Sequence, residues 1–367
     1  MIRYFLLISI CLSVLAGCKV GRYIIYNFAD INDYRKFPSR PLAASQTPFR
    51  FFTSEKNESP GTIQNEQSVS VDFENYLEEN KTVAFLIIRN DSLLYEKYFN
   101  SYDEDNIVPS FSMAKSFTSI LIGCAIEDGL IKSVNDPVTN YIPALKKNGF
   151  DDVSILNLLQ MTSGLKFNEG YFNPFGKVAT FYYGTQLRRA TERLKLEAAP
   201  GTSFAYKSGN TQLLGHLLDA VLEEKTVTDY FYEKVWGPLQ MEYDASWSID
   251  RKKNGIEKTF CCVNARARDF AKIGRLYLNK GNWNGKQIVS ENWVEISTKI
   301  DTTDGSANYY QYQWWIPSYE GDFLATGILG QYIYVLPEKN IIIVRLGKNK
   351  GNVEWWSLFR KLAKEVY

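Results

Sequence analysis

Residues 109–115 read Pro-Ser-Phe-Ser-Met-Ala-Lys, and an apolar run with helical spacing follows them. In that run apolar residues recur at offsets of three, four and seven positions, which places them on one buried helix face: Phe117, Ile120, Leu121 and Cys124. Proline and serine are typical helix starters, and Gly129 is of the type that ends a helix. The sequence therefore predicts a core helix that starts at this motif.

Ser112 and Lys115 share a face at the start of this helix. Free amides and the positive end of the helix dipole favour negative charge in the first turn, where Ser112 falls. A serine hydroxyl is a poor nucleophile until its proton is removed, and a partly buried lysine can remove it. The two residues are therefore a candidate nucleophile and base. The alternative is a polar first turn on a core helix, because a lone Ser-x-x-Lys is common by chance.

The N-terminus has the composition of an export signal. One positive charge in residues 1–3 precedes an almost wholly apolar stretch, Tyr4 to Val14, and Leu-Ala-Gly-Cys closes it at Cys18. An apolar stretch this short is typical of a cleaved signal, here residues 1–17, and not of a membrane span. The ending resembles the lipobox of bacterial lipoproteins. That resemblance implies that Cys18 is lipidated and anchors the exported protein to a membrane, on the periplasmic or cell-surface side; an ordinary secreted protein is the alternative.

Composition limits the classes of partner. About 350 residues remain after the signal, which is enough for one large domain or two closely packed ones. The 42 basic and 41 acidic residues give a formal net charge of +1, so no long-range attraction toward nucleic acid is expected. Aromatic residues make up 15% of the chain, a high share that suggests a substrate cleft or an adhesive surface.

Cysteine and histidine are scarce. Three cysteines are left after the signal and Cys18, and this odd number predicts no disulfide framework. Cys124 is expected in the core, and Cys261 and Cys262 are expected as reduced thiols, with a strained ring between them as the alternative. The single histidine, His216, excludes metal sites built on several histidines, and no cofactor is expected. It lies on a polar stripe that predicts a solvated helix face, so a lysine or tyrosine would have to serve Ser112.

Strands at both ends of the chain and helices between them predict an α+β fold. One antiparallel sheet would be built from N- and C-terminal parts and would carry a mainly helical region, residues 130–250. Residues 18–70 are expected to form a tether and a wrapping segment. Strands are predicted over 81–89, 93–99, 309–316, 322–326, 331–336 and 341–346, and helices over 154–161, 181–194, 211–224, 228–235, 354–367 and after a cap at Asn264.

A second polar cluster lies in residues 200–210, Pro-Gly-Thr-Ser-Phe-Ala-Tyr-Lys-Ser-Gly-Asn. This turn-rich segment leads into a helix, so Tyr206 and Ser208 can project from a loop. A phenol beside a lysine can have its pKa lowered and can pass protons. The alternative is an aromatic ring that plugs a helix end.

The chain resembles the penicillin-recognising serine hydrolases, the superfamily of class C β-lactamases, DD-peptidases and esterase relatives, and in particular the branch that contains 6-aminohexanoate-dimer hydrolase. Four segments carry this resemblance, in the family's order and spacing, from about Ser70 to the C-terminus. They are the Ser-x-x-Lys motif of residues 112–115, Tyr-Lys-Ser at 206–208, Leu-Leu-Gln-Met-Thr-Ser-Gly-Leu at 158–165, and Ala-Thr-Gly at 325–327 in the place of the Lys-Thr-Gly strand.

The resemblance implies a β-lactamase/transpeptidase-like domain over residues 71–367 and a role for each motif residue. Ser112 would attack a carbonyl to form an acyl-enzyme, and Lys115 and Tyr206 would share the acid and base work. The backbone amides of Ser112 and Ile328 would form the oxyanion hole. The residues expected to bind the substrate are Tyr171, Ser208, Gly327 and Gln331.

Two departures from the family pattern bear on the substrate. Ala325 replaces the lysine that helps relatives hold a substrate carboxylate, and Ser208 stands where many β-lactamases have asparagine. Efficient β-lactam hydrolysis is therefore not expected, and a carboxylesterase or amidase acting on small or peptide-like substrates is favoured. A catalytically silent lipoprotein that binds cell-wall peptide or a partner is the rival hypothesis. The α/β-hydrolase alternative has little support, because the chain has no Gly-x-Ser-x-Gly.

Overall fold

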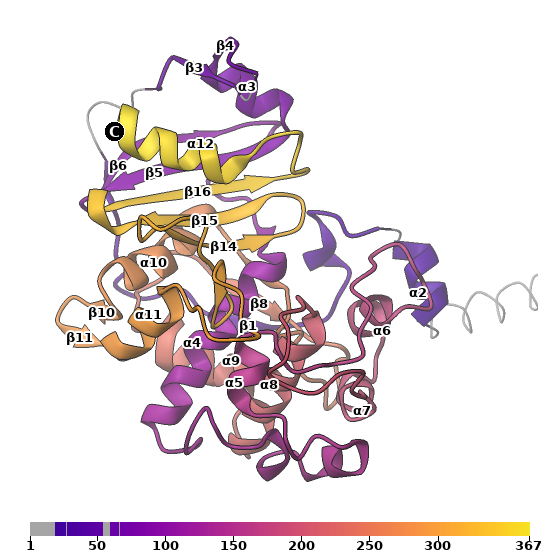
Figure 1. The fold of residues 1–367 in the computed structure, drawn as a ribbon. Helices are drawn as coiled ribbons and strands as arrows, with labels where there is room; N and C mark the ends of the chain where they lie inside the picture. Colours follow the sequence, from indigo (N-terminus) through magenta and orange to yellow (C-terminus); the bar gives the residue numbers. More distant parts are fainter. Residues whose placement is uncertain (1–18, 27, 54–58, 66) are drawn as a thin grey trace, which may run out of the picture.

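An eight-stranded sheet joins the two ends of the described chain (Figure 1). The computed structural model describes residues 19–26, 28–53, 59–65 and 67–367. In spatial order the strands are β12 (Tyr310–Gln311), β13 (Trp314–Trp315), β14 (Phe323–Gly327), β15 (Gln331–Leu336), β16 (Ile341–Gly347), β5 (Thr82–Arg89), β6 (Ser92–Tyr98) and β2 (Phe52–Thr53). Neighbours are antiparallel except β2 and β6, which are parallel. The predicted sheet, built from both ends of the chain, is confirmed.

Turn residues set the hairpins of this sheet. Asn90 and Asp91 connect β5 to β6 with φ of +51° and +62°, a backbone region that Asn and Asp tolerate better than other side chains. Asn340, with φ of +53°, does the same between β15 and β16 after the one-turn helix η6 (Pro337–Lys339). The short segments between the predicted strands therefore fold as the sequence indicates.

The single strand predicted over 309–316 is wrong. Tyr312 and Gln313 have φ of +40° and +69°, and this turn divides the stretch into β12 and β13. The Gln313 side chain donates to the carbonyls of Leu158 (3.0 Å) and Leu159 (2.7 Å), so the turn is held against the helical region. Contacts from a segment more than 150 residues away in the chain, which no local pattern reports, impose the break.

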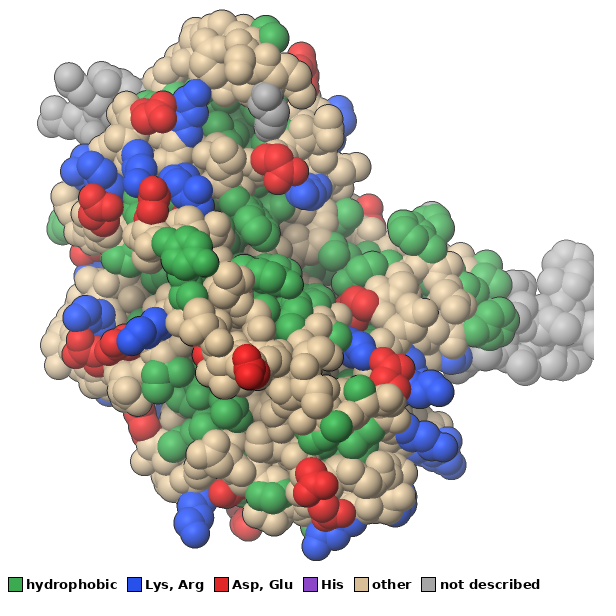
Figure 2. Space-filling view, in the orientation of Figure 1, with side chains coloured by type: hydrophobic (Ala, Val, Ile, Leu, Met, Phe, Trp, Pro, Cys, Tyr) green, Lys and Arg blue, Asp and Glu red, His purple; other side chains and the backbone are tan. Residues whose placement is uncertain are grey.

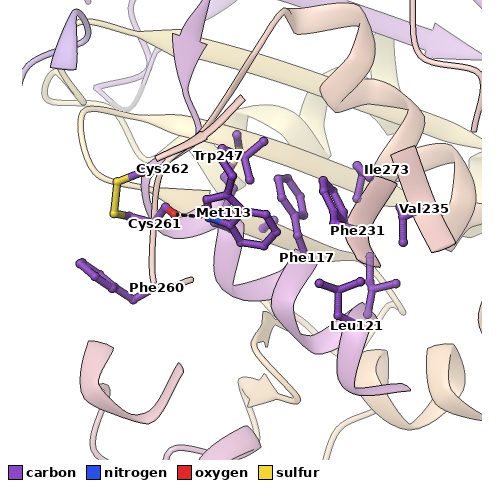
Figure 3. Packing of buried hydrophobic residues seen from close by; sticks show 14 of the residues in the cluster. Met113, Phe117, Leu121, Phe231, Val235, Trp247, Phe260, Cys261, Cys262 and Ile273 are labelled. Carbon is purple, nitrogen blue, oxygen red and sulfur yellow. Dashed lines mark hydrogen bonds between the residues drawn. A yellow bond between two sulfur atoms is a disulfide. The ribbon is translucent and has the colours of Figure 1, made fainter. Parts of the chain in front are cut away.

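The two faces of the sheet pack against different layers (Figure 1). Alternate side chains of a strand point to opposite faces: Phe85 and Ile87 of β5 pack with α3 (Phe73–Glu79) and α12 (Trp355–Lys361), while Leu86 and Ile88 face the larger core. That larger core contains α10 (Ala267–Leu278), α11 (Glu291–Thr298) and α4 (Ala114–Glu127). Figure 3 shows Phe117 and Leu121 of α4 near Phe231 and Val235.

The middle of the chain folds mostly into short helices: α5 (Ile155–Leu159), α6 (Lys177–Tyr183), α7 (Leu187–Thr191), α8 (Ser208–Val221) and α9 (Val227–Phe231), with the 3-10 helices η3 (Val138–Asn140) and η4 (Pro143–Asn148) and the π-helix η5 (Tyr232–Trp236). The single helix predicted over 181–194 is wrong, because the chain leaves helical geometry at Gly184. Its N–H caps the Thr180 carbonyl at 3.1 Å, and a Cβ there would overlap that carbonyl. Only glycine therefore fits at position 184, where the helix α6 ends.

A four-stranded sheet supports the start of the motif helix. Its strands, in spatial order, are β1 (Ser39–Leu42), β8 (Ala245–Ser248), β9 (Val263–Ala265) and β7 (Val108–Pro109). The predicted cap at Asn264 is wrong, since this residue lies in β9 and its amide donates to the hydroxyls of Ser246 and Ser248. Two hairpins, β3 (Thr62–Gln64) with β4 (Ser70–Asp72) and β10 (Asn282–Trp283) with β11 (Lys286–Gln287), complete the strands of the described chain.

The described part of residues 18–70 is packed into the domain. Helix α2 (Lys19–Tyr26) lies against α6, η1 (Asp33–Arg35) follows it, and β1 pairs with β8. Five apolar residues of this segment are buried: Ile31, Phe37, Leu42, Phe51 and Ile63. These contacts involve only the described part of the segment, and the expectation of a tether and a wrapping segment over residues 18–70 stays a prediction. Cys18 lies outside the described residues. Within those residues, no helix has both the length and the apolar character needed to cross a bilayer.

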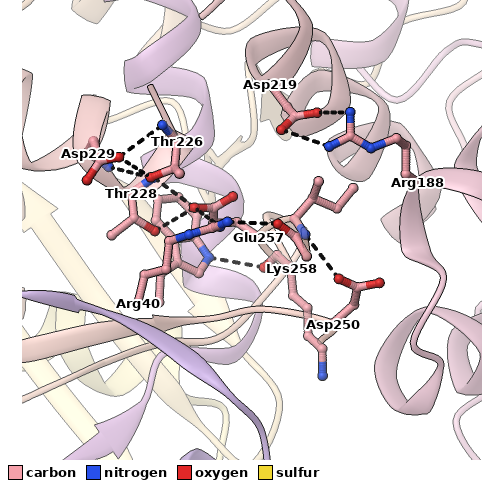
Figure 4. A network of polar contacts seen from close by, with 12 residues as sticks. Arg40, Arg188, Asp219, Thr226, Thr228, Asp229, Asp250, Glu257 and Lys258 are labelled. Carbon is pink, nitrogen blue, oxygen red and sulfur yellow. Dashed lines mark hydrogen bonds and ion pairs between the residues drawn. The ribbon is translucent and has the colours of Figure 1, made fainter. Parts of the chain in front are cut away.

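A buried polar network ties this segment to the helical region (Figure 4). Arg40 of β1 donates to Glu257 at 2.7 Å, and Glu257 also accepts from the N–H and hydroxyl of Thr228. Lys258 donates to the Tyr182 carbonyl at 2.7 Å and lies over the ring of Phe37. Because buried charges are costly unless they are paired or hydrogen-bonded, these contacts fix how residues 37–40 sit on the domain.

Two sequence expectations about side chains are corrected. Cys261 and Cys262 form a disulfide with each other and are not reduced thiols (Figure 3), whereas Cys124 is a buried free cysteine, as predicted. His216 is 4% exposed and does not lie on a solvated face. Burial lowers its pKa to about 4, and the charge of Arg188 adds to that shift. The polar stripe of α8 is covered by segments distant in sequence, as the bonds of Gln212 with the backbone of residues 257 and 259 show.

Candidate active site

Ser112 lies in a single helical turn, η2 (Phe111–Met113), that continues directly into α4. The residue before it, Phe111, has φ of +43°, a strained backbone conformation for a side chain of this size. The turn is fixed to β9, since the N–H of Ser110 donates to the Val263 carbonyl (2.7 Å) and its hydroxyl accepts from the Val263 N–H (3.0 Å). Ser112 itself stays partly exposed and lines two cavities.

Lys115 is 1% exposed and contacts the Ser112 hydroxyl. Its Nζ lies 2.9 Å from the Ser112 Oγ and donates to the Phe260 carbonyl at 3.0 Å. Burial lowers the pKa of Lys115 to about 8, and the negative charge of Glu169 opposes this shift. A substantial fraction of Lys115 is therefore neutral near physiological pH and able to accept the serine proton.

Tyr206 completes the group of three that the sequence predicts. Its hydroxyl is hydrogen-bonded to Ser112, and the Nζ of Lys115 lies 5.1 Å from the centre of its ring. Burial raises the pKa of Tyr206 well above its ordinary value; the bond to Ser112 opposes that shift and the charge of Glu169 adds to it. The expectation that an adjacent lysine lowers this pKa is wrong, because Lys207 turns away to the Leu165 carbonyl and to Glu197. Tyr206 therefore keeps its proton.

The strand opposite Ser112 approaches through Gly327. A Cβ at this position would overlap the Ser110 carbonyl, so glycine allows the backbone of β14 to pack against the turn that holds Ser112. Ile328, the next residue, lines both cavities together with Ser112. Gly327 therefore lets the backbone of β14 come close to the turn that holds Ser112, and it also lines the second cavity.

Gln331 does not take the substrate-binding role expected from the sequence. It is 0% exposed, and its amide donates to the carbonyls of Gly347 (2.7 Å) and Ile328 (3.3 Å) while accepting from the Gly347 N–H (3.0 Å). These bonds saturate the side chain inside the sheet. Gln331 therefore braces the segment that contains Ile328 and does not contact a substrate.

Arg345 also holds this segment, a role that sequence analysis missed. This buried guanidinium donates to the carbonyls of Leu329 (3.2 Å) and Gly330 (2.6 Å), to those of Asn80 and Asn349, and to the Thr82 hydroxyl. It lies in β16, where a run of apolar residues indicates only a buried strand. The turn after Ile328 thus depends on a residue whose partners come from three separate parts of the chain.

We expect Arg345→Met to lower the free energy of unfolding by about 3 kcal/mol, because several buried carbonyls lose their donor. Urea denaturation measures this change. Arg251→Met is the matched control, since Arg251 is exposed and donates to the Asn254 carbonyl at 3.4 Å; this variant should stay within about 0.5 kcal/mol of the native protein. Equal destabilisation by the two substitutions would contradict the role given to Arg345.

Two cavities meet at Ser112. The first has a volume of about 260 Å³ and is almost wholly apolar; its lining includes Phe28, Phe111, Phe172, Val178, Tyr182, Tyr183 and Phe260. The second has a volume of about 240 Å³ and is more polar; its lining includes Tyr206, Trp315, Thr326, Gly330, Tyr332 and Lys350. Ser112, Tyr171, Ile328 and Leu329 line both. A carbonyl carbon bound at Ser112 would therefore direct one substituent into each cavity.

Glu169 links two of the predicted substrate residues and was itself missed from the sequence. Its carboxylate accepts from the N–H of Ser208 (2.8 Å), from the Ser208 hydroxyl and from the Tyr171 hydroxyl (3.1 Å). Its charge also acts on Lys115 and Tyr206. The sequence signal is weak, because Glu169 lies only two residues before Tyr171 but 39 residues from Ser208. Glu169 is therefore a positioning residue that also sets the local charge.

The described residues contain no cluster of three or more His, Cys, Asp or Glu side chains arranged to hold a metal ion.

Known proteins resemble this chain in sequence and in fold. A family model described as "Beta-lactamase" matches residues 73–355. The chain is 30% identical over 296 residues to the 6-aminohexanoate-dimer hydrolase of Paenarthrobacter ureafaciens, covering 75% of this chain and 74% of that protein. A solved structure from Bacillus anthracis, of a protein proposed to be a 6-aminohexanoate-dimer hydrolase, superposes with a TM-score of 0.82 at 25% identity, over 93% of this chain and 94% of that one. A family VIII carboxylesterase shares the fold, with a TM-score of 0.61 at 17% identity over 76% and 88% of the two chains.

Proposed function

Because the chain belongs to the β-lactamase family of penicillin-recognising serine hydrolases, we propose that it hydrolyses an ester or amide bond through an acyl-enzyme on Ser112. One observation carries the proposal. The Ser112 hydroxyl lies 2.9 Å from the Nζ of Lys115, a buried amine with a pKa of about 8, and is also bonded to the protonated Tyr206. A nucleophile, a base and an acid therefore meet at one oxygen atom.

The three side chains divide the proton transfers by their pKa values. Neutral Lys115 accepts the serine proton as Oγ attacks the carbonyl carbon, and the backbone N–H groups of Ser112 and Ile328 stabilise the developing oxyanion by about 3 kcal/mol per donor. Tyr206 donates its proton to the leaving alcohol or amine and recovers one from Lys115. Water then attacks the acyl-enzyme with the same groups acting in reverse, which releases the acid and restores Ser112.

The cavities favour a carboxylesterase or amidase over a β-lactamase. Ala325 is fully buried in β14, so this strand offers no cation to a substrate carboxylate. The first cavity is lined by apolar and aromatic groups, which suit an uncharged acyl group. The proposed substrates are small or peptide-like esters and amides, and efficient hydrolysis of β-lactams is not part of the proposal.

Export and membrane attachment complete the proposal. The apolar stretch before Cys18 and the Leu-Ala-Gly-Cys ending support a lipoprotein that is anchored on the periplasmic or cell-surface side. The domain arrangement proposed with it is a signal over 1–17, a tether and wrapping segment over 18–70, and a hydrolase domain over 71–367.

A fluorophosphonate tests the proposed acyl-enzyme. The full chain in mild detergent is treated with the reagent, and intact-mass spectrometry followed by peptide mapping should find a single adduct on Ser112. Fluorophosphonates react only with an activated serine, so the adduct would justify a screen of esters and amides. No adduct on a folded protein would overturn the enzyme proposal and would favour a catalytically silent binding lipoprotein.

The pH dependence tests the charge of Glu169. Lys115 acts as the base only when neutral, so kcat/KM should fall as the pH drops below about 8. The carboxylate of Glu169 raises the pKa of Lys115. In Glu169→Gln, the fall in kcat/KM on the acid side, the acid limb of the pH profile, should therefore move to lower pH. Glu197→Gln is the control, since this exposed carboxylate pairs with Lys207 instead. A limb that stays in place for Glu169→Gln, or moves equally for both variants, would contradict the assignment.

A further inference from the structure

Large exposed apolar side chains gather beside the first cavity. Of the thirteen that the described residues leave exposed, six lie in two short segments, at 24–28 and 171–175: Ile24, Ile25, Phe28, Tyr171, Phe172 and Phe175. Figure 2 shows hydrophobic side chains on the lobe at the right. We call these six residues the apolar rim. Soluble proteins rarely expose such a cluster unless it meets another apolar surface.

The rim is continuous with the wall of the cavity. The rings of Phe28 and Phe172 meet edge to face at 5.3 Å, and both line the first cavity. Helix α2 is held in place, because Tyr23 packs on Tyr183 at 5.1 Å and the Nζ of Lys19 donates to the Thr180 hydroxyl at 2.7 Å. An apolar chain could therefore pass from the rim to Ser112 without leaving apolar surroundings.

The position of the rim in the chain identifies its partner. Helix α2 begins at Lys19, the residue after Cys18, and the apolar stretch Tyr4 to Val14 precedes it. With the proposed lipid on Cys18, the lipid-soluble part of the chain joins the protein at this point. The eight residues of α2 span only about 12 Å, so the rim lies close to any bilayer that holds the N-terminus.

We propose that the apolar rim rests on the lipid surface and that the first cavity receives the acyl chain of an ester or amide dissolved in that membrane. The substrate class is thus an amphiphile, with its apolar acyl chain in the first cavity and its more polar leaving group in the second. This inference rests on the proposed function: the substrate class depends on the acyl-enzyme at Ser112, and the contact between rim and membrane depends on the proposed membrane attachment.

A fluorescent label tests the contact. The full chain is reconstituted in phosphatidylcholine vesicles with nitrobenzoxadiazole on Phe175→Cys or, as the matched control, on Tyr319→Cys, which replaces an apolar residue that is 80% exposed outside both cavities. Signal from the chain without an added cysteine is subtracted. Nitroxide lipids should quench the label at position 175 and not the label at 319. An unquenched label at position 175 would overturn the contact between the rim and the membrane. If the emission of that unquenched label depended on protein concentration, a second copy of the chain would cover the rim.

Kinetics test the substrate class. Ile25→Asp and Phe175→Asp, which lie outside the cavity lining, should keep native activity on a water-soluble acetate ester. On dodecanoate esters embedded in vesicles their rate should fall at least about tenfold, because a charge at the rim opposes burial in lipid. Tyr319→Asp should behave as the native protein on both. Equal rates for all variants on vesicles would overturn the proposed substrate class. Inactivity of the native protein on every ester would instead refute the proposed function, and the quenching experiment would then decide whether the rim contacts the membrane.

Discussion

Replacing Ser112 by alanine is expected to lower kcat/KM for ester hydrolysis roughly 10⁵- to 10⁶-fold, because no other atom occupies the place where the acyl-enzyme forms. Initial rates with a chromogenic acetate ester measure the loss, and thermal unfolding should show that the variant remains folded. The fluorophosphonate adduct should disappear at the same time.

Ser119→Ala is the matched control for this change. Ser119 lies on the same helix, two turns further on, and its buried hydroxyl has no hydrogen-bond partner among the described residues. Its removal should leave kcat/KM within a factor of about two, since no hydrogen bond is lost. If Ser112→Ala kept most of the activity, the nucleophile would lie elsewhere and the proposed mechanism would be wrong.

The second large effect is expected for Lys115→Met, which should reduce kcat/KM by about 10³- to 10⁴-fold. The side chain keeps a similar length but cannot accept the Ser112 proton, and Tyr206 cannot replace it because its pKa is raised. The fall in activity below about pH 8 should also vanish from the residual rate, since the group that causes it is gone.

Lys207→Met decides which lysine matters. Lys207 is adjacent to Tyr206 in the chain, but its Nζ contacts Glu197 and the Leu165 carbonyl and faces away from Ser112. Its replacement should change kcat/KM only a few-fold. A loss as large as that of Lys115→Met would mean that the adjacent lysine, and not the buried one, controls the proton transfers.

Local patterns made candidates of the residues that meet at Ser112, and the family resemblance supplied their roles. Helical spacing placed Lys115 beside Ser112, and a turn-rich loop placed Tyr206 at the start of a helix, as the structure has them. The strand periodicity around Gln331 was also correct, but a strand alone does not say whether its first side chain faces a cavity or the sheet interior. The bonds of Gln331 to Gly347 decide this, and they join two different strands.

The missed features depend on contacts between distant segments. Glu169 accepts a hydrogen bond from Ser208, 39 positions further along the chain. His216 is buried because segments outside its helix, α8, cover it. Hydropathy periodicity reports which face of a helix is polar, but a polar face can still be covered when its groups are hydrogen-bonded. The disulfide between Cys261 and Cys262 is the exception, because its two cysteines are adjacent in the chain, and their adjacency alone does not reveal whether the sulfur atoms are joined.

The order of the strands also determines when this protein can fold. Strand β5, close to the start of the domain, has β16 as its neighbour, and Arg89 pairs with Ile341. The sheet therefore cannot close until almost the whole chain is available, and the two ends must meet across a very long loop, which makes folding slow. The export that we propose would benefit from this delay, because a translocation channel admits only an unfolded chain.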